Sequence, residues 1–191
     1  MAELKIVDYG PLAALIGTWY GDRGMDVAPE PDGEASSPYF ETICFEAGSD
    51  VTNAEAQVLA VVPYRQVVSR KSTGEVFHHE LGYWLWDAAA GIVIHSLQIP
   101  RAVALIAGGR HTGSAAADGS TVLEVRAALG DADWGIVQSP FMRDKARTTA
   151  FSHRITVRGE RLSYEETTVV EIYGRTFEHT DGNELARGGG S

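Results

Sequence analysis

The residues of this chain best suited to chemistry are its histidines, because imidazole binds metal ions and exchanges protons near neutral pH. They are His78, His79, His95, His111, His153 and His179. No two of them have the spacing of a helical zinc motif. Cys44 is the only cysteine, so no cysteine pair is present for a metal cluster or an internal disulfide. Two places remain as candidates, one around His78 and one around His179.

His78 and Glu80 are two residues apart, a spacing that puts both on one face of a β-strand. Such a pair could hold a metal ion or act as an acid and a base. A cross-strand hydrogen bond or an ordinary surface pair is the commoner reason for this pattern. Both faces of the segment are partly apolar, so periodicity leaves open whether His78 or His79 points inward.

His179 follows the last predicted strand, in a segment where a neutral imidazole could coordinate iron from the mouth of a barrel. The alternative is an exposed histidine in a C-terminal turn. Arg101, after Pro100, interrupts an apolar hairpin. Its guanidinium could neutralise a carboxylate or propionate at a rim, or it could face water.

The elements that must position these residues are almost all strands. Short segments rich in β-branched and aromatic residues are separated by Gly, Pro and Asp, a pattern that predicts about ten antiparallel strands closing into a barrel. Besides a first strand at Gly17, the predicted strands are residues 39–46, 54–68, 76–86, 92–99, 102–107, 121–129, 145–158 and 162–173.

The remaining segments are expected to be short. Residues 9–15 predict a short N-terminal helix, residues 28–38 an exposed loop, and Gly108-Gly109 a turn. The Gly17-x-Trp19 pattern begins the first strand, and the Trp side chain can plug one end of a barrel.

Length and charge limit the function classes. The 191 residues favour a single domain over residues 1–187 with a flexible tail at 188–191. The net charge of −10 argues against nucleic acid and anionic membranes as partners. No segment has the apolar length of a membrane span, and no secretory signal is visible, so a cytoplasmic location is expected.

Five segments, in order, resemble the nitrobindin-like haem-binding β-barrels. The first is Leu12–Gly24, which reads Leu-x-x-Leu-x-Gly-x-Trp-x-Gly-x-x-Gly, and the second is the aromatic-Glu strand Tyr39–Phe45. The third is His78–Trp84, with a His-x-Glu-x-Gly-aromatic pattern. Pro100–Gly109 and His179–Arg187 complete the set.

This resemblance implies an all-β fold, a roughly ten-stranded antiparallel barrel of the calycin or fatty-acid-binding-protein type with a short N-terminal helix. It implies ferric haem b as cofactor, with His179 as the proximal iron ligand and His78 on the distal side. Ile99 and Val169 would line the pocket. Members of the family are linked to nitric oxide binding and to isomerisation of peroxynitrite to nitrate, activities that need an open iron position.

The chain also departs from the family pattern. Glu178 and Thr180 make the flanks of the C-terminal histidine more polar, and Ala102 stands where Gly is usual. The alternative function is a haem-free carrier for a fatty-acid-like or other apolar ligand, with Arg101, or an arginine inside the barrel, holding a carboxylate. An enzyme using His78 and Glu80 as an acid/base pair is a third option. A small-molecule ligand is the expected partner, and a homodimer stays open.

Overall fold

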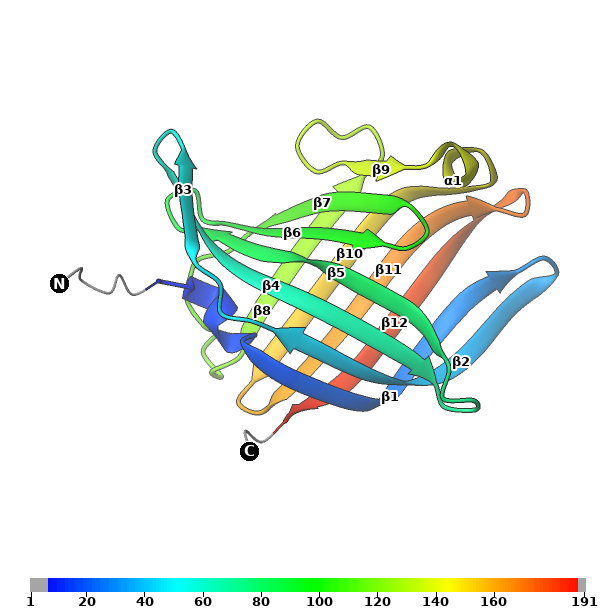
Figure 1. The fold of residues 1–191 in the computed structure, drawn as a ribbon, viewed down its shortest axis with the longest axis horizontal. Coiled ribbons are helices and arrows are strands. Elements are labelled where there is room, and N and C mark those ends of the chain that lie inside the picture. Colours follow the sequence, from blue (N-terminus) through cyan, green and yellow to red (C-terminus); the bar gives the residue numbers. More distant parts are fainter. Residues whose placement is uncertain (1–6, 189–191) are drawn as a thin grey trace.

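Strands with alternating buried and exposed residues close into a barrel in the computed structural model, which describes residues 7–188 (Figure 1). The ten strands of the ring are β1 (Gly17–Glu30), β2 (Gly33–Phe45), β4 (Gln57–Arg70), β5 (Val76–Asp87), β6 (Ile92–Ile99), β7 (Val103–Arg110), β8 (Thr121–Ala128), β10 (Ala146–Arg158), β11 (Arg161–Ile172) and β12 (Arg175–Arg187). Neighbouring strands are antiparallel, and the pairing of β2 with β4 closes the ring. The predicted fold class is confirmed.

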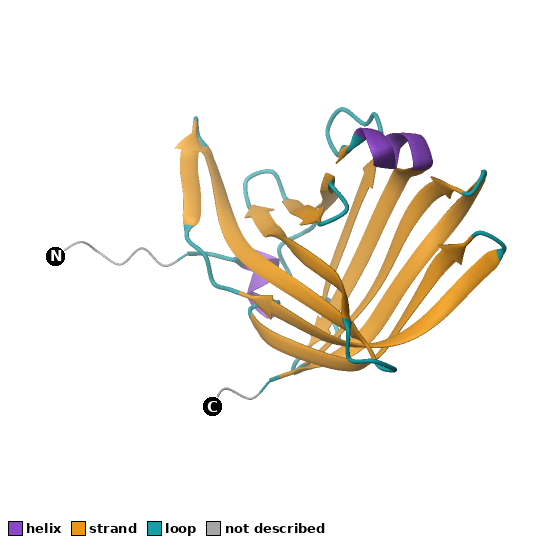
Figure 2. Cartoon of the chain, turned by 45° about the vertical axis from the view of Figure 1, so that its right-hand side comes forward, coloured by secondary structure: helices purple, strands orange, loops and turns teal. Residues whose placement is uncertain are grey.

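Four further elements lie outside the ring. They are the helices η1 (Gly10–Ala14) and α1 (Pro140–Lys145) and the short strands β3 (Asp50–Ala54) and β9 (Ile136–Gln138), which pair with β4 and β7. Figure 2 shows the two helices well apart, with α1 at the strand ends where β10 begins. We call that end of the barrel the mouth. Within residues 7–188, neither helix is long and apolar enough to cross a membrane.

The opposite end is plugged as the Gly-x-Trp pattern predicts. Trp19 is fully buried, and its indole Nε1 donates a hydrogen bond to the carbonyl oxygen of Leu15 at 2.7 Å. The Arg187 guanidinium lies 4.1 Å from the centre of the indole ring, a cation–π contact. Leu12, just before Leu15, is also fully buried. Because this end is filled by side chains, a ligand must enter from the mouth.

The central hairpin matches its prediction, but two other expectations were wrong. Residues 28–38 are not a loop: they form the ends of β1 and β2, paired from Ala28 with Ala35 to Glu30 with Gly33. Their Pro, Gly, Ser and acidic residues suit an exposed hairpin tip equally well.

Pro63 lies inside strand β4, although proline has no NH to donate to a neighbouring strand. The Pro63 carbonyl accepts a hydrogen bond from Glu46 N, the residue just after β2 ends at Phe45. In an antiparallel strand the NH and CO of one residue point toward the same neighbouring strand. The position of the missing Pro63 NH therefore faces the segment just after β2, where no β2 carbonyl needs a donor.

Gly108 and Gly109 are in β7 and not in a turn. A Cβ at Gly108 would lie 2.3 Å from the Trp134 ring, and one at Gly109 would lie 1.8 Å from the Glu124 carbonyl oxygen. These glycines let a side chain and a backbone carbonyl come close to β7. A glycine pair needed for such a close approach looks the same in the sequence as a glycine pair in a turn. Residues 189–191 of the predicted tail lie outside the described residues.

Candidate functional site

A row of carboxyl groups crosses the inner wall of the barrel. Asp26 on β1 is paired in register with Asp181 on β12, which is paired with Glu166 on β11. Glu166 is paired in turn with His153 on β10. Side chains at paired positions project from the same face of a sheet. We call Asp26, Asp181 and Glu166 the acidic row.

His179 is in a strand, not in a C-terminal turn as one interpretation of the sequence had it. It lies on β12 two residues before Asp181, so both side chains point into the barrel. Its Nε2 atom is 2.6 Å from Asp26 Oδ1 and 3.4 Å from Asp181 Oδ2. The side chain is 32% exposed, which makes it accessible from the mouth.

The two carboxyl groups beside His179 change its pKa. Burial by itself would lower the pKa of His179, but the hydrogen bond that its Nε2–H donates to Asp26 and the charge of Asp181 outweigh burial and raise that pKa. Burial raises the pKa of Asp181 to about 6, although the charge of His179 opposes that rise. The imidazole therefore lies between two carboxyl groups that favour its positive charge.

His78 and Glu80 also point inward, from β5 on the other side of the ring. This resolves the choice between the two adjacent histidines, because His79 is exposed on the outer face. His78 Nε2 is 3.7 Å from Glu80 Oε2, longer than a hydrogen bond, and the His78 side chain is 34% exposed. Glu80 is nearly fully buried and accepts a hydrogen bond from the Tyr64 hydroxyl.

Two further histidines lie deeper in the barrel. His95 is fully buried, stacks on Trp84 with ring centres 4.1 Å apart, and has its Nε2 atom 2.7 Å from the Tyr64 hydroxyl. His153 is 8% exposed, and neither of its ring nitrogens has a hydrogen-bond partner, although Nδ1 lies 3.3 Å from Glu166 Oε2. Burial lowers the pKa of His153 to about 4, so its ring is neutral near neutral pH.

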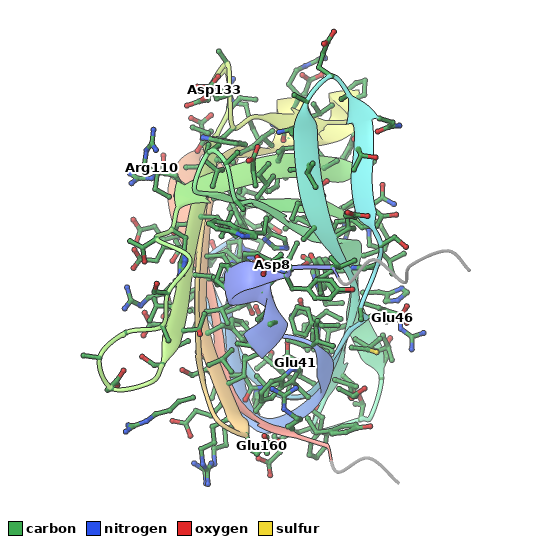
Figure 3. The ribbon with its side chains drawn as sticks, turned by 90° about the vertical axis from the view of Figure 1, so that its left-hand side faces the viewer. Asp8, Glu41, Glu46, Arg110, Asp133 and Glu160 are labelled. Atoms are coloured by element: carbon green, nitrogen blue, oxygen red, sulfur yellow. The ribbon has the colours of Figure 1, made fainter. Side chains whose placement is uncertain are left out.

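Glu41 connects four strands of the inner wall. Its carboxylate accepts hydrogen bonds from Gln66 Nε2 at 2.6 Å, the Tyr164 hydroxyl at 2.9 Å and Asn183 Nδ2 at 2.7 Å. These partners lie on β4, β11 and β12. Burial raises the pKa of Glu41 to about 7 despite the three donors. In Figure 3 Glu41 lies within the outline of the barrel, whereas Arg110 and Glu160 lie at its periphery.

Of the other predicted site residues, Ile99 points into the barrel and Val169 and Arg101 do not. Ile99 has the inward parity of His95 and packs partly buried against the core. Val169 has the opposite parity to Tyr164 and Glu166, so it projects to the outer face of β11 and not into the pocket that the resemblance implied. Arg101 is exposed in the turn between β6 and β7, at the mouth.

Sequence reasoning missed Asp26 and Glu166. Strand β12, which carries the partner of both residues, could have been found by its alternation. Its inward residues are every second one: His179, Asp181, Asn183 and Leu185. Only one of the four is apolar, so the alternation does not register as a strand with a hydrophobic face. On β1 the polar Asp26 likewise points inward, whereas its apolar neighbour Met25 is exposed.

The outer wall carries a separate hollow. It has a volume of about 1030 Å³, and its lining includes the exposed side chains of Leu81, Tyr83, Ile106 and Val137. The inward histidines and the acidic row are not part of its lining. The chemistry-bearing groups therefore belong to the mouth and interior of the barrel.

Comparisons with known proteins show the family to which this barrel belongs. The family model described as "THAP4-like, heme-binding beta-barrel domain" matches residues 8–187. The chain belongs to this haem-binding β-barrel family. A solved structure titled "Crystal Structure of Rv2717c from M. tuberculosis" is similar in fold, with a TM-score of 0.66 and 23% sequence identity, over 93% of this chain and 97% of that chain. No curated protein sequence matches the chain significantly.

Membership of the haem-binding β-barrel family supports haem binding in general, and the mouth can be tested for a place to hold the iron. An axial histidine must face inward and be reachable from the mouth, and His179 meets both conditions. When Nε2–H of a neutral His179 donates to Asp26, the lone pair resides on Nδ1, and a carboxylate partner of this kind orients a metal-binding imidazole and raises its basicity. The residues present therefore fit an iron ligand at His179.

Proposed function

We propose that this chain binds ferric haem b at the barrel mouth, that His179 is the axial ligand, and that the haem-bound protein handles nitric oxide or peroxynitrite. The observation that carries the proposal is the inward, accessible position of His179 on β12 in a member of the haem-binding β-barrel family. The deeper histidines are fully or nearly fully buried, which leaves His179 and His78 as the inward histidines that a ligand entering from the mouth meets first.

The chain's own residues would have three tasks. Asp26 holds the His179 ring in a fixed orientation through its 2.6 Å hydrogen bond. Ile99 contributes apolar surface that excludes water near the mouth. His78 offers an imidazole from the facing wall. Bound haem would supply an iron that can take up nitric oxide or promote the rearrangement of peroxynitrite to nitrate.

The haem-free carrier is the weaker candidate on electrostatic grounds. A fatty-acid carboxylate at the mouth would approach Asp26 and Asp181, whose two carboxyl groups oppose it and already share the His179 imidazole between them. Arg101, the cation expected to hold such a carboxylate, is exposed in a turn.

A hemin titration tests the proposed function. The wild-type chain should develop a Soret band at one equivalent of hemin, and His179→Ala should lose it. His79→Ala is the matched control, because it removes an exposed histidine from the outer face of the barrel and should bind hemin as the wild type does. His78→Ala should keep the Soret band but change the spectrum of the nitric oxide adduct. A His179→Ala chain that binds hemin with unchanged affinity would refute the assignment.

A further inference from the structure

We propose that Asp26, Asp181 and His179 also form a binding site for a divalent transition-metal ion in the haem-free protein. Each residue offers one ligand atom, and the three atoms all lie within 4.8 Å of one another. The site shares His179 and its partner Asp26 with the proposed haem site, and its argument does not depend on haem.

The distances between the ligand atoms are close to those that a metal ion requires. Zinc binds imidazole nitrogen and carboxylate oxygen at about 2.0–2.2 Å, so two ligands of a tetrahedral ion lie roughly 3.3 Å apart. His179 Nε2 and Asp181 Oδ2 are already 3.4 Å apart. His179 Nε2 and Asp26 Oδ1, at 2.6 Å, would need to separate by roughly 0.7 Å. A side-chain rotation of this size leaves β1 and β12 in place.

The electrostatics of the inner wall favour a cation at this position. Asp26 and Asp181 face each other across two paired strands, and like charges directly opposite are destabilising. Glu166 adds a third carboxyl group beside Asp181. Among the ion pairs of residues 7–188, the partners of these three acids are all histidines, with no Lys or Arg. A bound metal ion would add positive charge beside three carboxyl groups that share one imidazole, His179, at this end of the row.

The far end of the same row is also buried and polar. His153 is paired in register with Glu166, is more than nine-tenths buried, and has two ring nitrogens without hydrogen-bond partners. Buried polar atoms are almost always satisfied by protein or by a bound molecule. At this end of the row the polar atom beside His153 is Glu166 Oε2, 3.3 Å from its Nδ1.

The donor set indicates which metals fit. One imidazole nitrogen with two carboxylate oxygens suits zinc, cobalt, manganese and iron(II), whereas calcium and magnesium prefer all-oxygen shells. Three protein ligands leave at least one coordination position open, the arrangement of catalytic rather than structural metal sites. The open position would face the barrel interior, because all three side chains project from the inner wall.

Cobalt(II) is the probe of choice, because its visible d–d absorption reports nitrogen and oxygen ligands directly. Co²⁺ is titrated into the full-length chain without haem and without an affinity tag. The wild type should develop saturable d–d bands at one equivalent. Asp181→Asn and Asp26→Asn should each weaken the affinity at least 10-fold, since loss of even an outer partner of a metal ligand costs about 10- to 100-fold.

Glu178→Gln is the matched control, because it removes an exposed acid from the outer face of β12 next to His179 and should bind Co²⁺ like the wild type. Circular dichroism verifies that each variant is folded, and two independent Asp variants guard against failure of one. Asp variants that bind Co²⁺ as tightly as Glu178→Gln, or a wild type without d–d bands, would overturn the proposal. The outcome is separable from the haem assignment, because Asp181→Asn keeps His179 and should still bind hemin.

Discussion

The buried Glu41 should make the protein less stable as the pH rises. Its folded-state pKa is about 7, raised chiefly by burial from the usual value of 4.5, and its side chain is almost inaccessible. The folded state therefore binds more protons than the unfolded state between these two values, so the free energy of unfolding falls as pH rises through this window. Integrating the two titrations from about pH 5 to about pH 8 gives a loss of about 2.5 kcal/mol from this group.

Glu41→Gln removes the titration while keeping a hydrogen-bonding side chain. Urea unfolding of the wild type and the variant, at about pH 5 and about pH 8, measures the difference between their free energies of unfolding. That difference should shift by about 2.5 kcal/mol in favour of the variant at the higher pH. Other titrating groups cancel in the comparison. A difference that stays constant within about 0.5 kcal/mol would refute the reasoning.

Three further changes have defined outcomes. Trp19→Ala removes the plug of the closed end and should lower the free energy of unfolding by about 3–5 kcal/mol in urea. Gly108→Ala forces a Cβ to 2.3 Å from the Trp134 ring and should cost about 1–3 kcal/mol, read as a lower Tm. Ala102→Gly should raise Tm, because Ala102 has φ of 56°, a left-handed conformation that costs a non-glycine residue about 1 kcal/mol.

The barrel was predictable where the pattern of residues is local. The β5–β6 hairpin has β-branched and aromatic arms around an Asp- and Gly-containing turn, and its predicted limits agree with the structure within one residue. The Trp19 plug was predictable because the Gly-x-Trp pattern begins the first strand, where the Trp side chain can close one end of a barrel. Strand β12 was not predictable in this way, because most of its inward positions are polar and the strand shows no hydrophobic alternation.

The candidate site was predictable only in part, for a related reason. His78 and His179 stand out by residue type, but Asp26 contacts His179 across 153 positions of sequence. That contact depends on the register of β1 with β12, which no local pattern specifies. The inward or outward direction of Val169 likewise follows from the parity of β11, which was set only once Tyr164 and Glu166 were placed.

The most direct test of the central claim is chemical rescue of His179→Gly. Loss of the imidazole should remove the Soret band of the hemin-loaded protein, and added free imidazole should restore the wild-type spectrum by occupying the vacated position. His79→Gly, an outer-face control, should keep the wild-type spectrum without added imidazole. A His179→Gly protein that retains the wild-type spectrum before imidazole is added would contradict the assignment of His179 as the axial ligand.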